Sequence, residues 1–254
     1  DIPEGGRAAK GRAIVNLIGC EPDEKVSAFI SVKEFNDDHY VVMATEKGMV
    51  KKTKLSAYSN PRKKGIYAVE IRDGDKLIEA RVSTGDNDIL LGTRNGKSIR
   101  FSEEQIRASG RKTMGVKGIT LSSEDDRLVG MLLIKREGTV LVATEKGFGK
   151  RTEISQYRAQ KRGGKGVLTM KTTDKVGKMV TIKEVVDKDD LMIITNQGVL
   201  IRLPVAQIRS IGRATQGVKL IKLGDGTLVS SITRIMSEEE EDENNNTEPT
   251  DSKE

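Results

Sequence analysis

A glycine-marked repeat of about 50 residues limits what this chain can fold into more than any other feature. Glycines at equivalent positions recur at intervals of 54, 50, 51 and 51 residues, at Gly11, Gly65, Gly115, Gly166 and Gly217. A fixed period of this length is typical of solenoids, propellers and related arrays, in which one supersecondary unit is copied along the chain. We therefore expect residues 1–236 to form one array of about four to five such units.

Each copy predicts β-strands in the same order. A basic loop with the marker glycine leads into a short strand, in segments 7–17, 61–71, 111–121, 160–170 and 213–223. An apolar strand follows an acidic turn, at 25–32, 76–82, 127–134, 178–186 and 227–235. A hairpin completes the copy, at 40–48, 88–96, 140–147 and 191–198. The hairpins are predicted because their aliphatic runs end in Lys-Gly, Asn-Gly or Gln-Gly, where glycine supplies the positive φ of a tight turn.

The hairpin strands are apolar without alternation, which indicates that both of their faces are covered. Four-stranded sheets stacked radially around an axis bury strands in this way, so we predict an all-β, propeller-like array of blades. Counted from the loops, the repeats span 7–60, 61–110, 111–159 and 160–212, with a partial repeat at 213–236. Five loops and four hairpins place the start of the sequence within a repeat. Either residues 217–235 or a segment upstream would complete the first blade. Helix signals are scarce, and Ser102 with Gln105 predicts one helical turn at most.

Charge is distributed unevenly along the chain. From Ser237 onward nine acidic residues stand against one lysine, a net charge of −8, and because the whole chain carries +6 the preceding residues carry +14. A body this basic indicates a polyanionic partner, either nucleic acid or an anionic membrane. No apolar stretch approaches the ~20 residues of a membrane span. The acidic, Asn-rich segment 237–254 is predicted to be disordered, either as a solvated tail or as a tethered polyanion that competes for the basic surface.

Basic residues recur at fixed phase within the repeat. They follow each hairpin glycine, at Lys51, Lys52, Arg100, Lys150, Arg151 and Arg202. They also occur in the loops, at Arg62, Lys63, Lys64, Arg111, Lys112 and Arg213. A residue that recurs once per unit lies at the same radius in every unit, so these positions predict a band of positive charge around one rim. The alternative is that they are solubilising charges at exposed turns.

Residues that build catalytic or metal sites are scarce. His39 is the only histidine and Cys20 the only cysteine, so nucleophilic pairs, disulfides and zinc clusters find no partners, and a reducing cytoplasm fits this usage. The acidic clusters 37–38, 125–126 and 187–190 are interpreted as solvated turns rather than cation sites. Segment 92–98 is one residue short of a phosphate loop and lies on a hairpin. We predict no catalytic residue, no metal site and no cofactor in this segment.

One loop carries the heptad Gln160, Lys161, Arg162, Gly163, Gly164, Lys165 and Gly166. Its adjacent glycines let the backbone turn sharply and approach a surface without a side chain in between. The three basic side chains would meet phosphates, and turn amides would add donors. Apart from Gln160 nothing is suited to reading base edges, so binding is expected to tolerate sequence.

Within a 50-residue β repeat, this heptad resembles the gyrase A box, of pattern Gln-Arg/Lys-Arg-Gly-Gly-Lys/Arg-Gly, and matches it at every position. The chain is therefore similar to the C-terminal domain family of the DNA gyrase A subunit. The resemblance covers about residues 1–236 and includes segments 11–17, 48–53, 147–152 and 212–218. In the family the box lies in the first blade, whereas here it falls in the fifth module. It is either a second copy, with the defining box upstream, or a box that is placed differently.

The resemblance implies a six-bladed β-pinwheel whose basic rim wraps double-stranded DNA, with an acidic tail that modulates wrapping. Its partners would be the remainder of the gyrase A subunit, together with the gyrase B subunit, in a bacterial cytoplasmic, nucleoid-associated enzyme that holds two copies of each. That enzyme is an ATP-hydrolysing isomerase that introduces negative supercoils, and its catalytic parts lie elsewhere. Two other readings stay open. One is the C-terminal domain of the topoisomerase IV A subunit, which is a similar pinwheel without the strict box. The other is a propeller-like scaffold for protein partners.

Overall fold

The computed structural model describes residues 15–18, 24–62, 65–135 and 137–235 of this chain. Its elements are almost all β-strands, arranged in sheets A to D. Sheet A contains β1 (Tyr40–Thr45), β2 (Met49–Lys54), β3 (Leu77–Ser83) and β6 (Val116–Lys117). Sheet B contains β4 (Asp88–Thr93), β5 (Lys97–Ser102), β7 (Leu128–Ile134) and β10 (Val167–Leu168). Sheet C contains β8 (Thr139–Thr144), β9 (Phe148–Glu153), β11 (Met179–Val185) and β14 (Val218–Lys219). Sheet D contains β12 (Asp190–Thr195), β13 (Leu200–Pro204) and β15 (Val229–Ile235).

The four predicted hairpins are confirmed as the strand pairs β1–β2, β4–β5, β8–β9 and β12–β13. Each turns at a glycine with positive φ, for example +83° at Gly96. A Cβ on Gly96 would also lie 2.1 Å from the carbonyl oxygen of Met170, so this turn excludes a side chain on two grounds. Turn chemistry and close packing therefore select glycine together.

Sheets A, B and C each combine strands from three successive sequence repeats, and the described strands of sheet D come from two. The first hairpin strand pairs with a third strand from the next repeat, as β4 does with β7. The second hairpin strand of sheets A to C pairs with a two-residue edge strand from the repeat after that: β2 pairs with β6, β5 with β10 and β9 with β14. The order in sheet B is thus β10-β5-β4-β7. A sheet and a sequence repeat are not the same unit.

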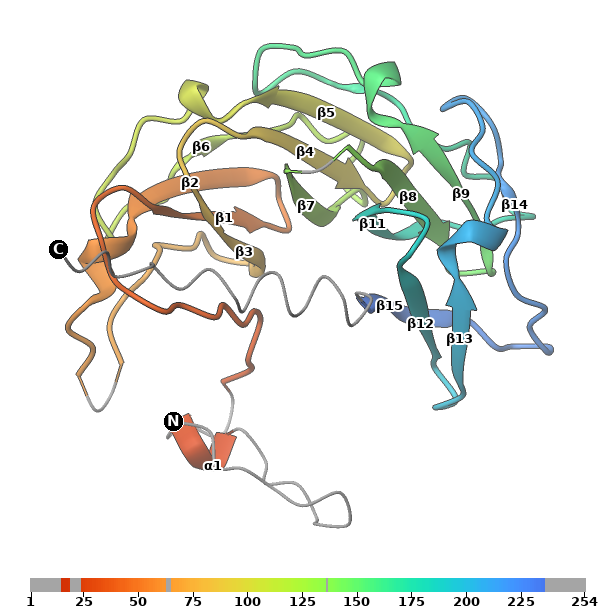
Figure 1. The fold of residues 1–254 in the computed structure, drawn as a ribbon, viewed down its shortest axis with the longest axis horizontal. Helices are drawn as coiled ribbons and strands as arrows, with labels where there is room; N and C mark the ends of the chain where they lie inside the picture. The colour runs from red at the N-terminus through yellow and green to blue at the C-terminus, as the bar shows by residue number, and fades with distance from the viewer. Residues whose placement is uncertain (1–14, 19–23, 63–64, 136, 236–254) are drawn as a thin grey trace, which may run out of the picture.

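The sheets follow one another around an arc, with sheet A at one end and sheet D at the other (Figure 1). Third strands line the inside of the arc, where β3 contacts β7, β7 contacts β11 and β11 contacts β15. The second hairpin strands and the edge strands lie toward the outside (Figure 1). The predicted all-β, propeller-like array is confirmed.

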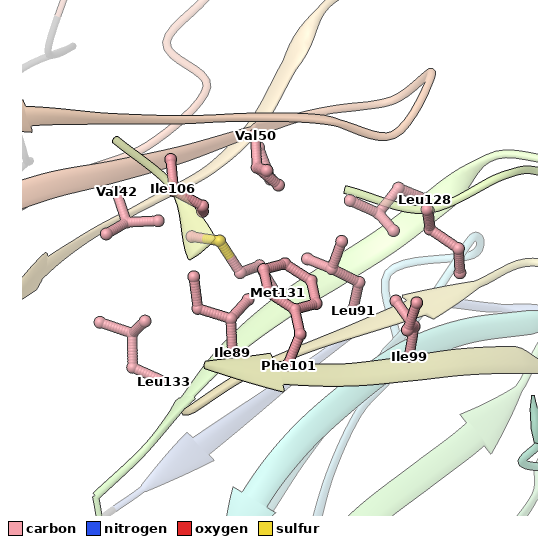
Figure 2. Close-up of a cluster of buried hydrophobic side chains, with 12 residues drawn as sticks. Val42, Val50, Ile89, Leu91, Ile99, Phe101, Ile106, Leu128, Met131 and Leu133 are labelled. Atoms are coloured by element: carbon pink, nitrogen blue, oxygen red, sulfur yellow. The ribbon is translucent and has the colours of Figure 1, made fainter. Parts of the chain in front are cut away.

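Hydrophobic cores fill the spaces between neighbouring sheets. Figure 2 shows the core between sheets A and B, where Val42 and Val50 meet Ile89, Leu91 and other side chains of sheet B. The residue between the last two, Leu90, points to the other side and packs with sheet C. Both faces of β4 are therefore buried, which is the physical reason for its uninterrupted apolar sequence.

Some predicted elements are absent. The strand predicted at 25–32 is wrong: Ala28, Ile30 and Val32 pack against the core of sheet A, but no described strand lies beside them to form a ladder. The short strand expected within 61–71 is also missing from the described residues, and the described end of segment 7–17 enters a helix, α1 (Val15–Ile18). No described helix is both long and apolar enough to cross a membrane.

A single 3-10 turn follows each hairpin. The turns are η1 (Leu55–Tyr58), η2 (Glu103–Gln105), η3 (Ile154–Gln156) and η4 (Val205–Gln207). The predicted cap is confirmed at η2, where the Ser102 hydroxyl accepts from the Glu104 amide at 3.2 Å. The other three turns lack a side-chain cap, and their sequences carry no helix signal.

Candidate nucleic-acid interface

Three loops at the outer edge of the arc carry the heptad and the predicted basic residues Arg111, Lys112 and Arg213. We call residues 107–115, 158–166 and 209–217 the rim loops. Each leaves the 3-10 turn of its own sheet, crosses to the preceding sheet and ends at the glycine before that sheet's edge strand. Counted back from Gly115, Gly166 and Gly217, the loops align residue for residue, and the heptad is the last part of the second one.

Repeated backbone hydrogen bonds hold the rim loops in register. The third residue of each loop donates its amide to a hairpin strand of the preceding sheet, as Gln160 does to the Arg100 carbonyl at 2.8 Å. The seventh residue accepts an amide that follows the edge strand one sheet further back, as Gly164 does from Thr120 at 2.9 Å. Equivalent bonds occur in the other two loops. The rim loops therefore tie neighbouring sheets together.

The heptad glycines serve this packing. Gly166 has a φ of +68°, and a Cβ there would lie 2.2 Å from the Ser98 carbonyl oxygen. Gly163 has a φ of +79° and donates its amide to the Gly118 carbonyl at 2.6 Å. Gly164 covers Ile99, whose Cδ1 would be 3.5 Å from an added Cβ. All three glycines are half-buried, so they let the loop approach its own protein.

The heptad arginine also bonds to protein. Arg162 donates from Nε to the Gln105 carbonyl at 2.9 Å and from Nη1 to the Lys117 carbonyl at 3.2 Å. Its counterpart Arg213 donates to the Leu168 carbonyl at 2.9 Å. Lys117 and Leu168 are equivalent residues of successive edge strands, so the arginine makes the same inter-sheet contact twice. These two guanidinium groups are half-buried supports of the rim.

Gln160 and Arg111 are half-buried too. The Nε2 of Gln160 is enclosed and has no hydrogen-bond partner among the described residues. The donor nitrogen of this amide therefore does not reach the surface. The backbone carbonyl of Arg111, rather than its side chain, makes the hydrogen bond described next.

Two of the lysines predicted to line the rim are buried under it. Lys51 is 1% exposed, and its Nζ donates to the Ala68 carbonyl at 2.8 Å and to the Arg111 carbonyl. Lys150 is 0% exposed and donates to the carbonyls of Gly212, at 2.6 Å, and Arg213. Both lysines occupy the same position of the repeat, but that position lies inside the protein rather than on its surface.

Burial acts on the ionisation of both lysines. Burial is the main cause that lowers the pKa of Lys51 and of Lys150 to about 8. The nearby charges of Arg111 and Arg213, respectively, contribute the smaller part of this shift.

One basic residue in each hairpin, the fourth after its glycine, is matched by a carboxylate. The pairs are Lys52–Glu103 (3.6 Å), Arg100–Asp88 (2.6 Å), Arg151–Asp187 and Arg202–Asp190 (2.5 Å). Lys52 and Arg151 are buried, Arg100 is half-buried and Arg202 is exposed. These cations are largely compensated within the protein, so they do not form a band of free positive charge.

Other predicted residues do reach the surface. Lys161 and Lys165 of the heptad, Lys112 of the first rim loop and Arg62 are exposed. Lys112 lies over the Tyr67 ring, 5.8 Å from its centroid. Lys63, Lys64 and segment 237–254 lie outside the described residues.

Sequence reasoning missed one series of arginines. Arg107, Arg158 and Arg209 open the three rim loops and are exposed. Within the described part of the chain, none of their side chains makes a hydrogen bond or an ion pair. Successive arginines of this series are 51 residues apart in both intervals. Each stands four residues before a second arginine of its loop, which is Arg111, Arg162 or Arg213. That Arg-x-x-x-Arg recurrence would have identified them.

The interface offers charge without reactive chemistry. Among the described residues, no three His, Cys, Asp or Glu side chains gather to hold a metal ion. What the rim presents is a repeated set of exposed cations on loops that are fixed by backbone bonds. Such an arrangement suits a regularly spaced polyanion.

Comparison with known proteins decides the family. A family model described as "DNA gyrase C-terminal domain, beta-propeller" matches residues 1–33, 39–84, 87–135, 138–185 and 189–234. The chain belongs to this family. From residue 39 onward, each segment matched by the gyrase family model runs from the first hairpin strand to the third strand of one sheet. The resemblance drawn from the heptad and its repeat is confirmed.

Two relatives with high sequence identity are both DNA gyrase A subunits. The DNA gyrase A subunit of Staphylococcus epidermidis (strain ATCC 12228) is 45% identical over 243 residues, and that of Staphylococcus aureus (strain NCTC 8325) is 44% identical. Each alignment covers 94% of this chain and 27% of the relative. The chain thus spans about a quarter of the curated relatives it matches.

Solved structures agree on the fold. The C-terminal domain of DNA topoisomerase IV superposes with a TM-score of 0.83 at 25% identity, covering 89% of this chain and 71% of that one. The DNA gyrase A C-terminal domain gives a TM-score of 0.80 at 23% identity, covering 90% and 76%.

Proposed function

We propose that this domain binds duplex DNA along the outer edge of the arc and bends it around the rim loops. The observation that carries the proposal is the series Arg107, Arg158 and Arg209. These arginines are exposed, unpaired within the described residues and placed identically on three successive sheets. Exposed lysines of the same loops, Lys112 and Lys161 among them, extend the series. Equal spacing around a curve is what a bent polyanion requires.

Energetics favour such binding. Smooth bending of 20–30 bp by 40–90° costs on the order of 1–6 kcal/mol. Release of counterions from about 6–10 phosphates offsets that cost and makes the affinity fall steeply with salt. Because the rim loops are bonded to two sheets each, little ordering remains to be done when DNA arrives.

Binding should tolerate sequence. The amide nitrogen of Gln160 is enclosed, and the exposed groups named above are cations suited to phosphates. Bendable DNA would still be preferred, since the protein selects for deformability without touching base edges.

Within a longer protein, we propose that the domain acts as part of the DNA gyrase A subunit, in concert with the gyrase B subunit, on DNA of the bacterial nucleoid. Wrapping would present one duplex segment over another with fixed hand and so direct ATP-dependent strand passage toward negative supercoils. Cleavage and ATP hydrolysis would belong to other parts of that enzyme. No cofactor is assigned to this segment.

A second candidate is the C-terminal domain of the topoisomerase IV A subunit, because a solved domain of that enzyme superposes with a TM-score of 0.83. The intact heptad and the 45% identity to a gyrase relative favour gyrase.

The test removes the exposed arginines together. We expect the triple variant Arg107→Ala, Arg158→Ala, Arg209→Ala to lower the slope of log K against log salt by about 0.9 per arginine, for a duplex of mixed sequence. The control replaces Lys47, Lys146 and Lys175 by alanine, which removes the same charge from exposed residues at the hairpin-turn ends. Equal slopes for the two triple variants would refute the proposed interface.

A further inference from the structure

We propose that Lys51 and Lys150 are positioning residues: each holds the backbone of a rim loop in the shape that presents the loop's exposed cations to DNA. The inference rests on the proposed DNA-binding function for its consequence, but its structural part stands alone. It replaces direct phosphate contact, which the sequence pattern had suggested for both lysines. We call the two ammonium groups with their acceptors the lysine clasps.

The clasps share one geometry. The third residue after the hairpin glycine, on β2 or β9, sends its Nζ outward beneath the loop. Lys150 donates to the carbonyls of Gly212 and Arg213 and, at 3.1 Å, to the Thr215 hydroxyl. Lys51 donates to the Arg111 carbonyl and, at 2.8 Å, to that of Ala68. Arg111 and Arg213 occupy the same loop position, so the same carbonyl is held twice.

Each clasped loop has a threonine that completes the turn. Thr113 donates its hydroxyl to the Gly110 carbonyl at 3.0 Å, and Thr215 donates to the Gly212 carbonyl at 3.1 Å. The second rim loop lacks both parts. It has Ile99 in place of the lysine and Gly164 in place of the threonine, and a Cβ added to Gly164 would lie 3.5 Å from the Cδ1 of Ile99. A lysine at the hairpin position therefore accompanies a threonine in the loop, and an isoleucine at the hairpin position accompanies a glycine in the loop.

This pairing indicates that the same loop shape is built in two ways. In the heptad loop, Gly164 faces the apolar side chain of Ile99. In the other two loops, backbone carbonyl groups accept hydrogen bonds from the ammonium group of a buried lysine. Neither ammonium group has a carboxylate within ion-pair distance among the described residues, and the nearest charges are Arg111 and Arg213. Carbonyl and hydroxyl oxygens alone compensate its lost hydration. Removing the cation therefore takes away the donor that gathers these partly buried oxygens beneath the loop.

The consequence concerns the exposed cations of the two clasped loops, Arg209 in one and Arg107 with Lys112 in the other. Their positions on the rim depend on a backbone that bends around the clasp. Loss of the clasp should loosen the loop and displace its exposed cations, whereas loss of a phosphate-contacting lysine would leave the loop unchanged.

The experiment compares Lys150→Met with Ile99→Met, both apolar replacements of similar length at equivalent sites. For Lys150→Met we expect faster amide hydrogen exchange in residues 212–217, unchanged exchange in β8, and a salt slope for duplex DNA lowered by about 0.9, the value for the one exposed cation of that loop, Arg209. Ile99→Met should leave the exchange of residues 160–166 and the slope unchanged. The same loss of slope with unchanged loop exchange would assign Lys150 to direct phosphate contact and overturn the proposal.

A milder pair of variants covers the case in which Lys150→Met does not fold. Thr215→Val removes one acceptor of the clasp and the turn bond, while Thr215→Ser keeps the hydroxyl. We expect faster loop exchange in the valine variant and near-native exchange in the serine variant. Equal exchange in both would overturn the clasp. Because exchange is measured without DNA, a failure of the proposed function and a failure of the clasp give different results.

Discussion

At the scale of single residues, position in the repeat and exposure are separate properties. Lys51 and Arg158 are both basic and both recur in phase with the repeat, yet one is 1% exposed and the other lies at the surface. Phase fixes the distance of a residue from the axis of the array. Whether the side chain is covered depends on the loop of the next repeat, which the local sequence does not describe.

The buried lysines make stability depend on pH in a specific direction. Their pKa is about 8 in the folded protein against 10.5 ordinarily, so between those values the unfolded chain binds more protons. The free energy of unfolding should therefore gain a contribution that rises from about pH 8 to 10.5. We expect urea unfolding at about pH 8 and about pH 10 to show a smaller rise for Lys150→Met than for the unsubstituted protein. An identical rise in both proteins would contradict this assignment.

At the scale of elements, the sequence predicts the long strands well because they carry their own signals. The run 88–96 contains an aliphatic strand and an Asn-Gly turn, and the structure confirms both in β4 and its hairpin. Edge strands such as β10 have two residues and no periodicity, and their partner lies in another repeat. Segment 25–32 fails for the opposite reason: it has the apolar pattern, but no described neighbour makes it a strand.

The junction at Gly166 offers a test of edge-strand pairing. Gly166→Ala would place a Cβ 2.2 Å from the Ser98 carbonyl oxygen at a φ of +68°, so β10 could not lie against β5 without a backbone shift. We expect a loss of at least about 2 kcal/mol in the free energy of unfolding. The matched control is Gly110→Ala, where nothing lies within 4 Å of the added atom and φ is not positive. Equal unfolding midpoints in urea would contradict the packing role.

At the scale of the whole molecule, the arc gives direction to the charge. Sheets joined by inner-strand contacts hold their rim loops toward the outside of the arc (Figure 1), and these loops carry the exposed arginines. The sequence predicted a positive rim but not the series Arg107, Arg158 and Arg209, and the heptad identified the family. It did not separate the cations that face solvent from those that support the loops.

Chiral wrapping is the whole-molecule prediction. Nicked circular DNA sealed by ligase with increasing amounts of this protein should show a linking-number shift of one sign that grows with protein. The triple arginine variant should give a smaller shift at equal concentration. Tight, salt-sensitive binding without any shift would mean that the rim bends DNA without imposing a hand.

The exchange of edge strands between repeats also sets the order in which the protein is completed during synthesis. Sheet B has its long strands once Ile134 has emerged from the ribosome, but its edge strand begins only at Val167. At about 5–20 residues per second, β5 waits seconds for its neighbour. Each sheet that has an edge strand thus remains incomplete until the later repeat supplying that strand is synthesised. A stalled ribosome would leave an unpaired strand that could pair with a second chain.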